Sequence, residues 1–195
     1  KWSLKNSTIH NIKAGIHPGY EDRDNFGRVS LKLPIDELLD SLNEQIKRLI
    51  AIAQKQQVIL HHIKFHGALY NDIEQQFELA DVLSNFLYQH YPSYNVIGLA
   101  GGLLQNFCIA KGLTFIAEGF IDRRYKSNGK LTPRSEEGAV IVDQSESLTQ
   151  AKALALGTEI ETSDELWIKP IVKTLCLHGD NPNAVVIAQA LSNSL

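Results

Sequence analysis

The sequence predicts an α/β protein in which helices cover the outside of a parallel sheet or barrel. Apolar, strand-like runs alternate almost strictly with amphipathic helical segments along the 195 residues, a pattern typical of βα units. A predicted strand also ends in a histidine followed closely by glycine three times, at His17-Pro18-Gly19, His66-Gly67 and His178-Gly179. Because such folds collect their catalytic groups at the carboxyl ends of strands, these motifs predict where a site lies.

The strand before His66 is the most informative stretch. Residues 58–63 are rich in β-branched and apolar side chains, as a strand buried on both faces requires. The other strands are expected at residues 12–16, 95–100, 114–117 and 171–177, with a short extended piece at 138–142. Helices are expected at residues 1–10, 34–56, 72–90, 103–111 and 145–156, and a last one opening at Asn181-Pro182.

Composition limits the kinds of partner. The length suits one domain, residues 1–195, with a sizeable core, and 44% hydrophobic residues are typical of a globular protein. A net charge of -3 without a run of lysine or arginine argues against a nucleic-acid or membrane-surface partner. The longest apolar run, residues 96–104, is far shorter than the ~20 residues of a membrane helix, and no signal segment precedes it. We therefore expect a cytoplasmic protein that binds small ligands.

Two further motifs are considered and set aside. Cys108 and Cys176 lie far apart with no Cys-x-x-Cys pair, so neither a zinc knuckle nor a redox motif is indicated, and both are expected to be buried. Gly101-Gly102 follows a predicted strand, but the spacing of a phosphate-binding loop is absent. A plain turn from strand to helix is the better interpretation.

Five acidic or histidine side chains lie at or just beyond predicted strand ends, and a barrel would bring them to one rim: His17, His66, Glu118, Asp122 and His178. Such a group could bind a divalent metal, hold a general base near neutral pH, or hydrogen-bond a polar substrate. The sequence leaves these three roles open, and any single histidine could instead be structural. His66 is expected to face the barrel mouth, because Gly67 lets the backbone turn away behind it.

A second set of polar residues suggests an anionic ligand. Cations gather near the same strand ends although the chain is acidic overall, and a guanidinium can grip a carboxylate or phosphate with two parallel hydrogen bonds. The alternative for each is a solvated loop charge. The set consists of Arg23, Arg28, Lys64, Arg123, Arg124 and Arg134, with Tyr70, Asn71 and Asp180 close to it in the sequence.

Six blocks of sequence, in this order, resemble the LamB/YcsF family, also called the A component of 5-oxoprolinase. They span nearly the whole chain: Gly15-Ile-His-Pro-Gly-Tyr-Glu-Asp-Arg23, Phe26-Gly-Arg28, Lys64-Phe-His-Gly-Ala-Leu-Tyr-Asn71, Glu118-Gly-Phe-Ile-Asp-Arg-Arg-Tyr125, Gly129-Lys-Leu-Thr-Pro-Arg134 and Cys176-Leu-His-Gly-Asp180.

The resemblance implies a fold and an activity. The fold would be a distorted barrel of seven parallel strands, similar to the glycoside hydrolase/deacetylase architecture. The activity would be the ATP-dependent opening of 5-oxoproline to L-glutamate together with partner subunits B and C. The sequence has no nucleotide-binding loop of its own, which agrees with phosphorylation by the partners. A divalent metal, with His17 and His66 as candidate ligands, and assembly into a homo-oligomer are left open.

The sequence also departs from the family. Members normally begin with an Asp-Leu-Asn-x-Asp-x-Gly-Glu strand and an Asn-Ile-Ala-Cys-Gly-x-His-Ala-Gly-Asp segment, and neither is present. These two strands and the five predicted here would make seven, so residues 138–142 are expected to lie outside the barrel. Two alternatives remain beside the 5-oxoprolinase assignment. One is a metal-dependent deacetylase or amidohydrolase acting alone, and the other is a non-catalytic substrate-binding subunit.

Overall fold

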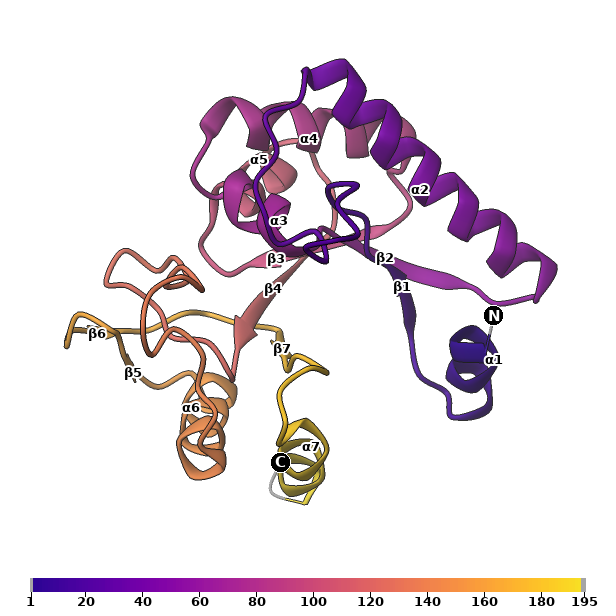
Figure 1. The fold of residues 1–195 in the computed structure, drawn as a ribbon. Helices are drawn as coiled ribbons and strands as arrows, with labels where there is room; N and C mark the ends of the chain where they lie inside the picture. The colour runs from indigo at the N-terminus through magenta and orange to yellow at the C-terminus, as the bar shows by residue number, and fades with distance from the viewer. Residues whose placement is uncertain (1, 194–195) are drawn as a thin grey trace. The chain divides into compact units, whose positions relative to one another are not determined.

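Five short parallel strands form one sheet in the computed structural model, which describes residues 2–193 (Figure 1). They follow the order β1-β2-β3-β4-β7. The predicted α/β class and the five predicted strands are thereby confirmed, and residues 138–142 lie outside the sheet. The strands are β1 (Ala14–Ile16), β2 (Leu60–Lys64), β3 (Asn95–Leu99), β4 (Phe115–Phe120) and β7 (Thr174–Cys176).

Seven helices accompany the sheet within the described residues. The longest begins after Pro34 and carries Leu38, Leu42 and Ile46, each four residues from the next, on its buried face, as expected of an amphipathic helix. The helices are α1 (Trp2–Ile9), α2 (Ile35–Lys55), α3 (Gly67–Ile73), α4 (Phe77–His90), α5 (Leu103–Ala110), α6 (Gln144–Leu156) and α7 (Ala184–Ser192).

The single helix predicted over residues 72–90 is wrong, because the structure has two helices there, α3 and α4. The first begins directly after His66, where Gly67 takes a left-handed φ of 61° and turns the chain. Asn71 therefore lies inside α3, where its side-chain amide donates to the Gly67 carbonyl at 3.2 Å.

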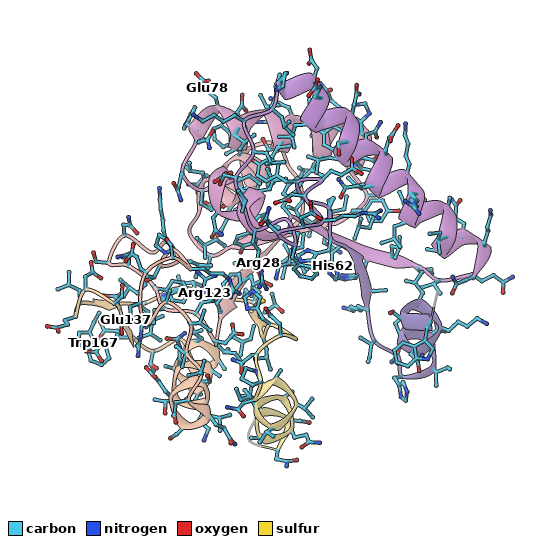
Figure 2. The ribbon with its side chains drawn as sticks, in the orientation of Figure 1. Arg28, His62, Glu78, Arg123, Glu137 and Trp167 are labelled. Atoms are coloured by element: carbon cyan, nitrogen blue, oxygen red, sulfur yellow. The ribbon has the colours of Figure 1, made fainter. Side chains whose placement is uncertain are left out.

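Smaller differences concern element boundaries. Glu118 lies within β4 and not beyond its end, and β7 is shorter than predicted. The segment between α6 and residue 170, where the sequence analysis places no helix or strand, contains a two-stranded antiparallel sheet of β5 (Ile160–Glu161) and β6 (Trp167–Ile168). The indole of Trp167 is exposed there (Figure 2). Cys176 is only partly buried, whereas Cys108 is buried as expected.

The chain forms two compact units, one of residues 1–98 and 106–115 and the other of residues 99–105 and 116–195. In the first unit, α2, α3 and α4 lie on the same side of β2 and β3 (Figure 1). Each of these helices contributes a fully buried leucine to the core, namely Leu42, Leu69 and Leu83. In the second unit, α6 packs against α7 and against β7, around Leu154 and Ile187. Of the helices in residues 2–193, none has the length and apolar character needed to cross a membrane.

The Gly67 turn provides a test of the fold. A Cβ atom at Gly67 would lie 2.2 Å from the Gly27 carbonyl oxygen, in addition to the strain of a positive φ. Gly67→Ala is therefore expected to lower the free energy of unfolding by about 2–4 kcal/mol, from roughly 1 kcal/mol of backbone strain and 1–3 kcal/mol of steric overlap. Gly129→Ala is the matched control, because Gly129 has a φ of 78° and a Cβ added there would meet no atom within 4 Å.

Denaturant unfolding of both variants measures the difference. Gly129→Ala should cost only the backbone strain, about 1 kcal/mol. Equal losses in the two variants would contradict the close approach of Gly67 to the Gly27 carbonyl.

Candidate active site

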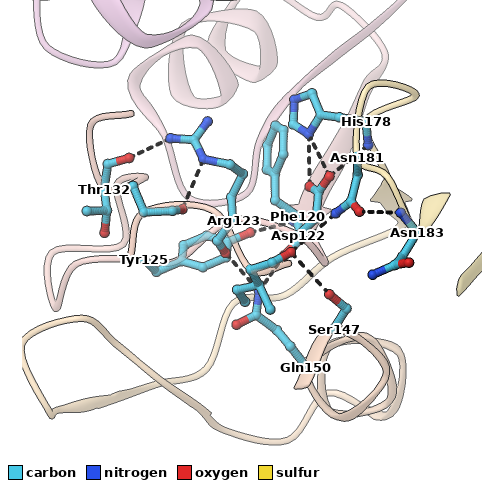
Figure 3. Close-up of polar contacts among 12 residues, drawn as sticks. Phe120, Asp122, Arg123, Tyr125, Thr132, Ser147, Gln150, His178, Asn181 and Asn183 are labelled. Carbon is cyan, nitrogen blue, oxygen red and sulfur yellow. Dashed lines mark hydrogen bonds and ion pairs between the residues drawn. The ribbon is translucent and has the colours of Figure 1, made fainter. Parts of the chain in front are cut away.

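Asp122 and His178 form a hydrogen-bonded pair in the second unit (Figure 3). The His178 Nδ1 atom lies 2.8 Å from Asp122 Oδ1, and the His178 backbone N–H donates to Asp122 Oδ2 at 3.0 Å. Since a carboxylate only accepts, Nδ1 is the nitrogen that donates, and in the neutral form of the ring the lone pair lies on Nε2. Nε2 has no hydrogen-bond partner among residues 2–193, so it is the atom able to take a proton from a ligand or water.

The sheet register brings these two residues together. Phe120 at the end of β4 is paired with Cys176 at the end of β7, and Asp122 and His178 each follow two residues later. Parallel neighbours thus carry both side chains past the same sheet edge. The Phe120 ring then stacks on the imidazole, with centroids 5.7 Å apart and an angle of 25° between the planes.

The carboxyl group of Asp122 is only 1% exposed. Burial by itself raises the pKa of Asp122, but the hydrogen bonds and charge of His178, together with the charge of Arg134, lower it further than burial raises it. The net pKa lies below its ordinary value. Asp122 is therefore a carboxylate at neutral pH and can hold His178 in one tautomer.

Backbone contacts hold the loop after β4 in place. The Gln150 amide, on α6, donates to the carbonyls of Phe120 and Arg123 at 2.7 and 2.8 Å. The hydroxyl of Tyr125, which is 1% exposed, accepts from the Phe120 N–H at 2.7 Å. The Asp122 carbonyl accepts from the Ile141 N–H at 3.0 Å. These bonds satisfy the buried polar groups of the turn and fix the direction of the Asp122 side chain.

Arg123 is a buried cation beside this pair. Its side chain is 3% exposed, and the guanidinium donates to the backbone carbonyls of Ala139, at 3.3 Å, and of Thr132 (Figure 3). Burial and the nearby charge of Arg134 lower the pKa of Arg123 to about 10, although Asp122 acts in the opposite direction. Two guanidinium groups that repel each other favour an anion between or beside them.

The first unit contains a pair of histidines, His17 and His66, whose rings are in contact. His17 Nε2 lies 3.0 Å from His66 Nδ1. The remaining ring nitrogens face backbone oxygens: His17 Nδ1 lies 2.8 Å from the Lys64 carbonyl, and His66 Nε2 lies 2.8 Å from the Phe26 carbonyl. The two residues follow β1 and β2, whose ends are paired at Ile16 and Ile63.

Sequence reasoning missed a buried carboxylate in the first unit, Asp72. Asp72 accepts from the Tyr20 hydroxyl at 2.9 Å and from the Ser30 hydroxyl at 2.8 Å. Burial and the Asp72 hydrogen bond and charge raise the pKa of Tyr20. The only signal in the sequence was an acidic residue among the apolar positions of the predicted helix. The contacts show that it ties residues 20–30 to α3.

The other predicted ligand-binding residues have varied surroundings. The Lys64 amine lies over the buried ring of Tyr70, 5.8 Å from its centroid, and the Arg28 guanidinium lies over the Phe26 ring at 5.3 Å. Arg124 forms an ion pair with Glu146 at the start of α6. Of the remaining residues predicted for the site, Glu118 is buried. The exposed ones are Arg23, Arg134 and Asp180.

Four of the five residues predicted for the rim form two pairs, one in each compact unit, and the fifth, Glu118, is buried in β4. A single rim shared by all five stays a prediction. Within residues 2–193, no group of three or more His, Cys, Asp or Glu side chains is placed to hold a metal ion. The binding of a divalent metal and the use of ATP also stay predictions.

The fold and the Asp–His pair define a class, that of α/β proteins with ionisable groups beyond the carboxyl ends of parallel strands, where enzymes of this architecture carry their sites. The chain belongs to the LamB/YcsF family, whose model matches residues 3–195. It is also similar to a solved structure, the lactam utilization protein from Thermus thermophilus, with 29% sequence identity and a TM-score of 0.88. That alignment covers 99% of this chain and 78% of the other.

The depressed pKa of Asp122 predicts a dependence of stability on pH. A carboxyl group whose pKa is lower in the folded state contributes stability above its unfolded pKa, about 3.9, and loses it as pH falls through the folded value. Asp122→Asn should therefore be less stable than the wild type at pH 7, by about 1–3 kcal/mol for a buried hydrogen-bonded group. The difference should shrink below pH ~4.

Denaturant unfolding from pH 3 to pH 7 measures this difference. Asp164→Asn is the control for a surface carboxylate, because Asp164 also has a lowered pKa, about 2, from hydrogen bonds to Ser127 and Thr162, but is fully exposed. A stability difference for Asp122→Asn that stays constant over this pH range would contradict the assignment.

Proposed function

We propose that this chain is a subunit of an ATP-dependent 5-oxoprolinase and takes part in opening the lactam ring of 5-oxoproline to give L-glutamate. Membership of the LamB/YcsF family and the likeness to a lactam utilization protein support this substrate class. The observation that carries the chemistry is the Asp122–His178 pair, whose bare Nε2 is a ready general base.

The reaction explains why a positioned base is useful. The amide of an unstrained five-membered lactam is a poor electrophile, so phosphoryl transfer from ATP to its carbonyl oxygen is the activating step, for which partner subunits B and C would supply the nucleotide site. His178 Nε2 then takes a proton from water as the water oxygen bonds to the carbonyl carbon. As the C–N bond breaks, the same imidazolium returns the proton to the departing ring nitrogen. The resulting acyl phosphate is hydrolysed to the free carboxylate and inorganic phosphate.

Asp122 and the arginines have separate tasks in this scheme. The carboxylate accepts from Nδ1, keeps Nε2 free and stabilises the imidazolium when it forms. Arg123 and Arg134 favour an anion on the same unit, and the carboxylate of 5-oxoproline or the transferred phosphoryl group supplies one.

The test begins with the activity itself. ATP hydrolysis stimulated by 5-oxoproline is measured with the candidate partner subunits, with and without this chain. The proposal predicts that stimulation requires the chain. Stimulation that is complete without it would overturn the assignment, as would amide hydrolysis by the chain alone without ATP.

Variants then test the base. His178→Ala should lower kcat by about 10²-fold or more, the usual range for loss of a general acid-base group, and Asp122→Asn should also lower kcat because the tautomer is no longer fixed. His90→Ala is the control, because His90 is an exposed histidine at the end of α4. Unchanged turnover in folded His178→Ala would remove His178 from the reaction while leaving the substrate assignment intact.

A further inference from the structure

A closed series of four hydrogen bonds joins the loop after β7 to the loop after β4. The His178 N–H donates to Asp122 Oδ2 at 3.0 Å, and the Asp122 carbonyl accepts from the Ile141 N–H at 3.0 Å. The Ile141 carbonyl accepts from the Asn181 side-chain amide at 3.2 Å, and the Asn181 N–H donates to the His178 carbonyl at 3.1 Å. The series starts and ends at His178, so both backbone polar groups of this residue are engaged.

The side chain of Asn181 is buried, and both ends of its amide are used. The residue is 7% exposed, Nδ2 donates to the Ile141 carbonyl, and Oδ1 accepts from the Asn183 N–H at 2.9 Å (Figure 3). An amide that faces a carbonyl with one end and an N–H with the other has a single favourable orientation. The Ser147 hydroxyl lies 3.5 Å from the same Ile141 oxygen, longer than an ordinary O–H···O bond, so Asn181 is its principal side-chain donor.

The loop between β7 and α7 depends on such hydrogen bonds. Residues 177–183 contain no helix or strand. Gly179 directly follows His178, and a Cβ added at Gly179 would meet no atom within 4 Å, so close packing at this glycine does not hold the loop. The Asn181 side chain therefore attaches the middle of the loop to Ile141.

We propose that Asn181 is a positioning residue for the base, because it holds the loop after β7 against Ile141 and so keeps the His178 imidazole in place. The inference rests on the proposed function of His178 and adds a residue to that site. Asn181 acts through His178 and contacts no reacting atom. Its effect can still be large, since a misplacement of about 1 Å can lower the rate of an enzyme by about 10²-fold.

Asn183 provides a matched comparison two residues later. Its side-chain amide donates to the carbonyl of Val142, the neighbour of Ile141, at 2.9 Å. This bond joins the same two segments, but Asn183 is not part of the series that returns to Asp122. A role limited to anchoring α7 would make the two asparagines equivalent, whereas a positioning role belongs to Asn181 alone.

Steady-state kinetics of the chain with its partner subunits test the position of the base. Asn181→Ala should lower kcat for 5-oxoproline-dependent ATP hydrolysis by about 10- to 100-fold and leave KM within about twofold, because the base is displaced and the substrate-binding groups are not. Asn183→Ala should leave kcat within about twofold of the wild type. Equal losses of kcat in the two folded variants would overturn the inference.

Asn181→Ser separates the two bonds of the side chain and serves where Asn181→Ala folds poorly. A serine hydroxyl can accept from the N–H two residues later, as the asparagine does, but it is too short to reach the Ile141 carbonyl. The loss of kcat in Asn181→Ser should therefore match that in Asn181→Ala. Wild-type turnover in Asn181→Ser would limit the residue to the start of α7 and contradict the inference.

A double variant separates this inference from the proposed function. Because Asn181 acts only through His178, adding Asn181→Ala to His178→Ala should lower kcat no further, whereas two independent roles would multiply the two losses. A further loss in the double variant would overturn the positioning role. Unchanged turnover in His178→Ala alone would instead remove the proposed base, and the position of the ring is then decided by a measurement without turnover.

Nuclear magnetic resonance of the full chain at one fixed pH supplies that measurement. The His178 imidazole stacks on the Phe120 ring with centroids 5.7 Å apart, so the ring current of Phe120 displaces the imidazole C–H resonances. Asn181→Ala should move these resonances towards those of a free imidazole, and Asn183→Ala should leave them in place. Identical His178 resonances in the wild type and in Asn181→Ala would overturn the inference, whatever the activity assay shows.

Discussion

The buried carboxylate of Asp122 is the group on which the polar centre of the second unit depends. A charge that is 1% exposed is tolerated only if it is hydrogen-bonded, and His178 meets this requirement through both its backbone N–H and its imidazole. Because one carboxylate fixes both the loop after β7 and the tautomer of the ring, the position of the base and the stability of the unit have the same origin.

The hydrogen-bond partners of a histidine ring decide its role, as the Asp122–His178 and His17–His66 pairs show. In His178 a carboxylate occupies Nδ1 and leaves Nε2 bare, which is the condition for proton transfer to or from a ligand. In His17 and His66 two backbone carbonyls and the ring–ring contact occupy all four nitrogens. Such a pair can hold a loop, but it would have to give up a hydrogen bond before it could exchange a proton with substrate.

The residues of these pairs were predicted from the sequence, but which residue contacts which was not. Apolar, β-branched runs were sufficient to find the five strands, and the histidines and Asp122 were identified because they follow strand ends. The partners depend on strand order, which brings β4 beside β7 although they are far apart in the chain, and no local pattern encodes that pairing. The division between α3 and α4 was missed for a similar reason, since the turn at Gly67 depends on its close approach to the Gly27 carbonyl.

Chemical rescue tests the central claim, that His178 Nε2 is the base, most directly. In His178→Gly the missing ring leaves space beside Asp122, and added imidazole can occupy it and accept the same proton. The account predicts that imidazole restores 5-oxoproline-dependent ATP hydrolysis in His178→Gly, measured with the partner subunits, and has no effect on His90→Gly. Turnover of His178→Gly equal to that of the wild type before imidazole is added would contradict the account.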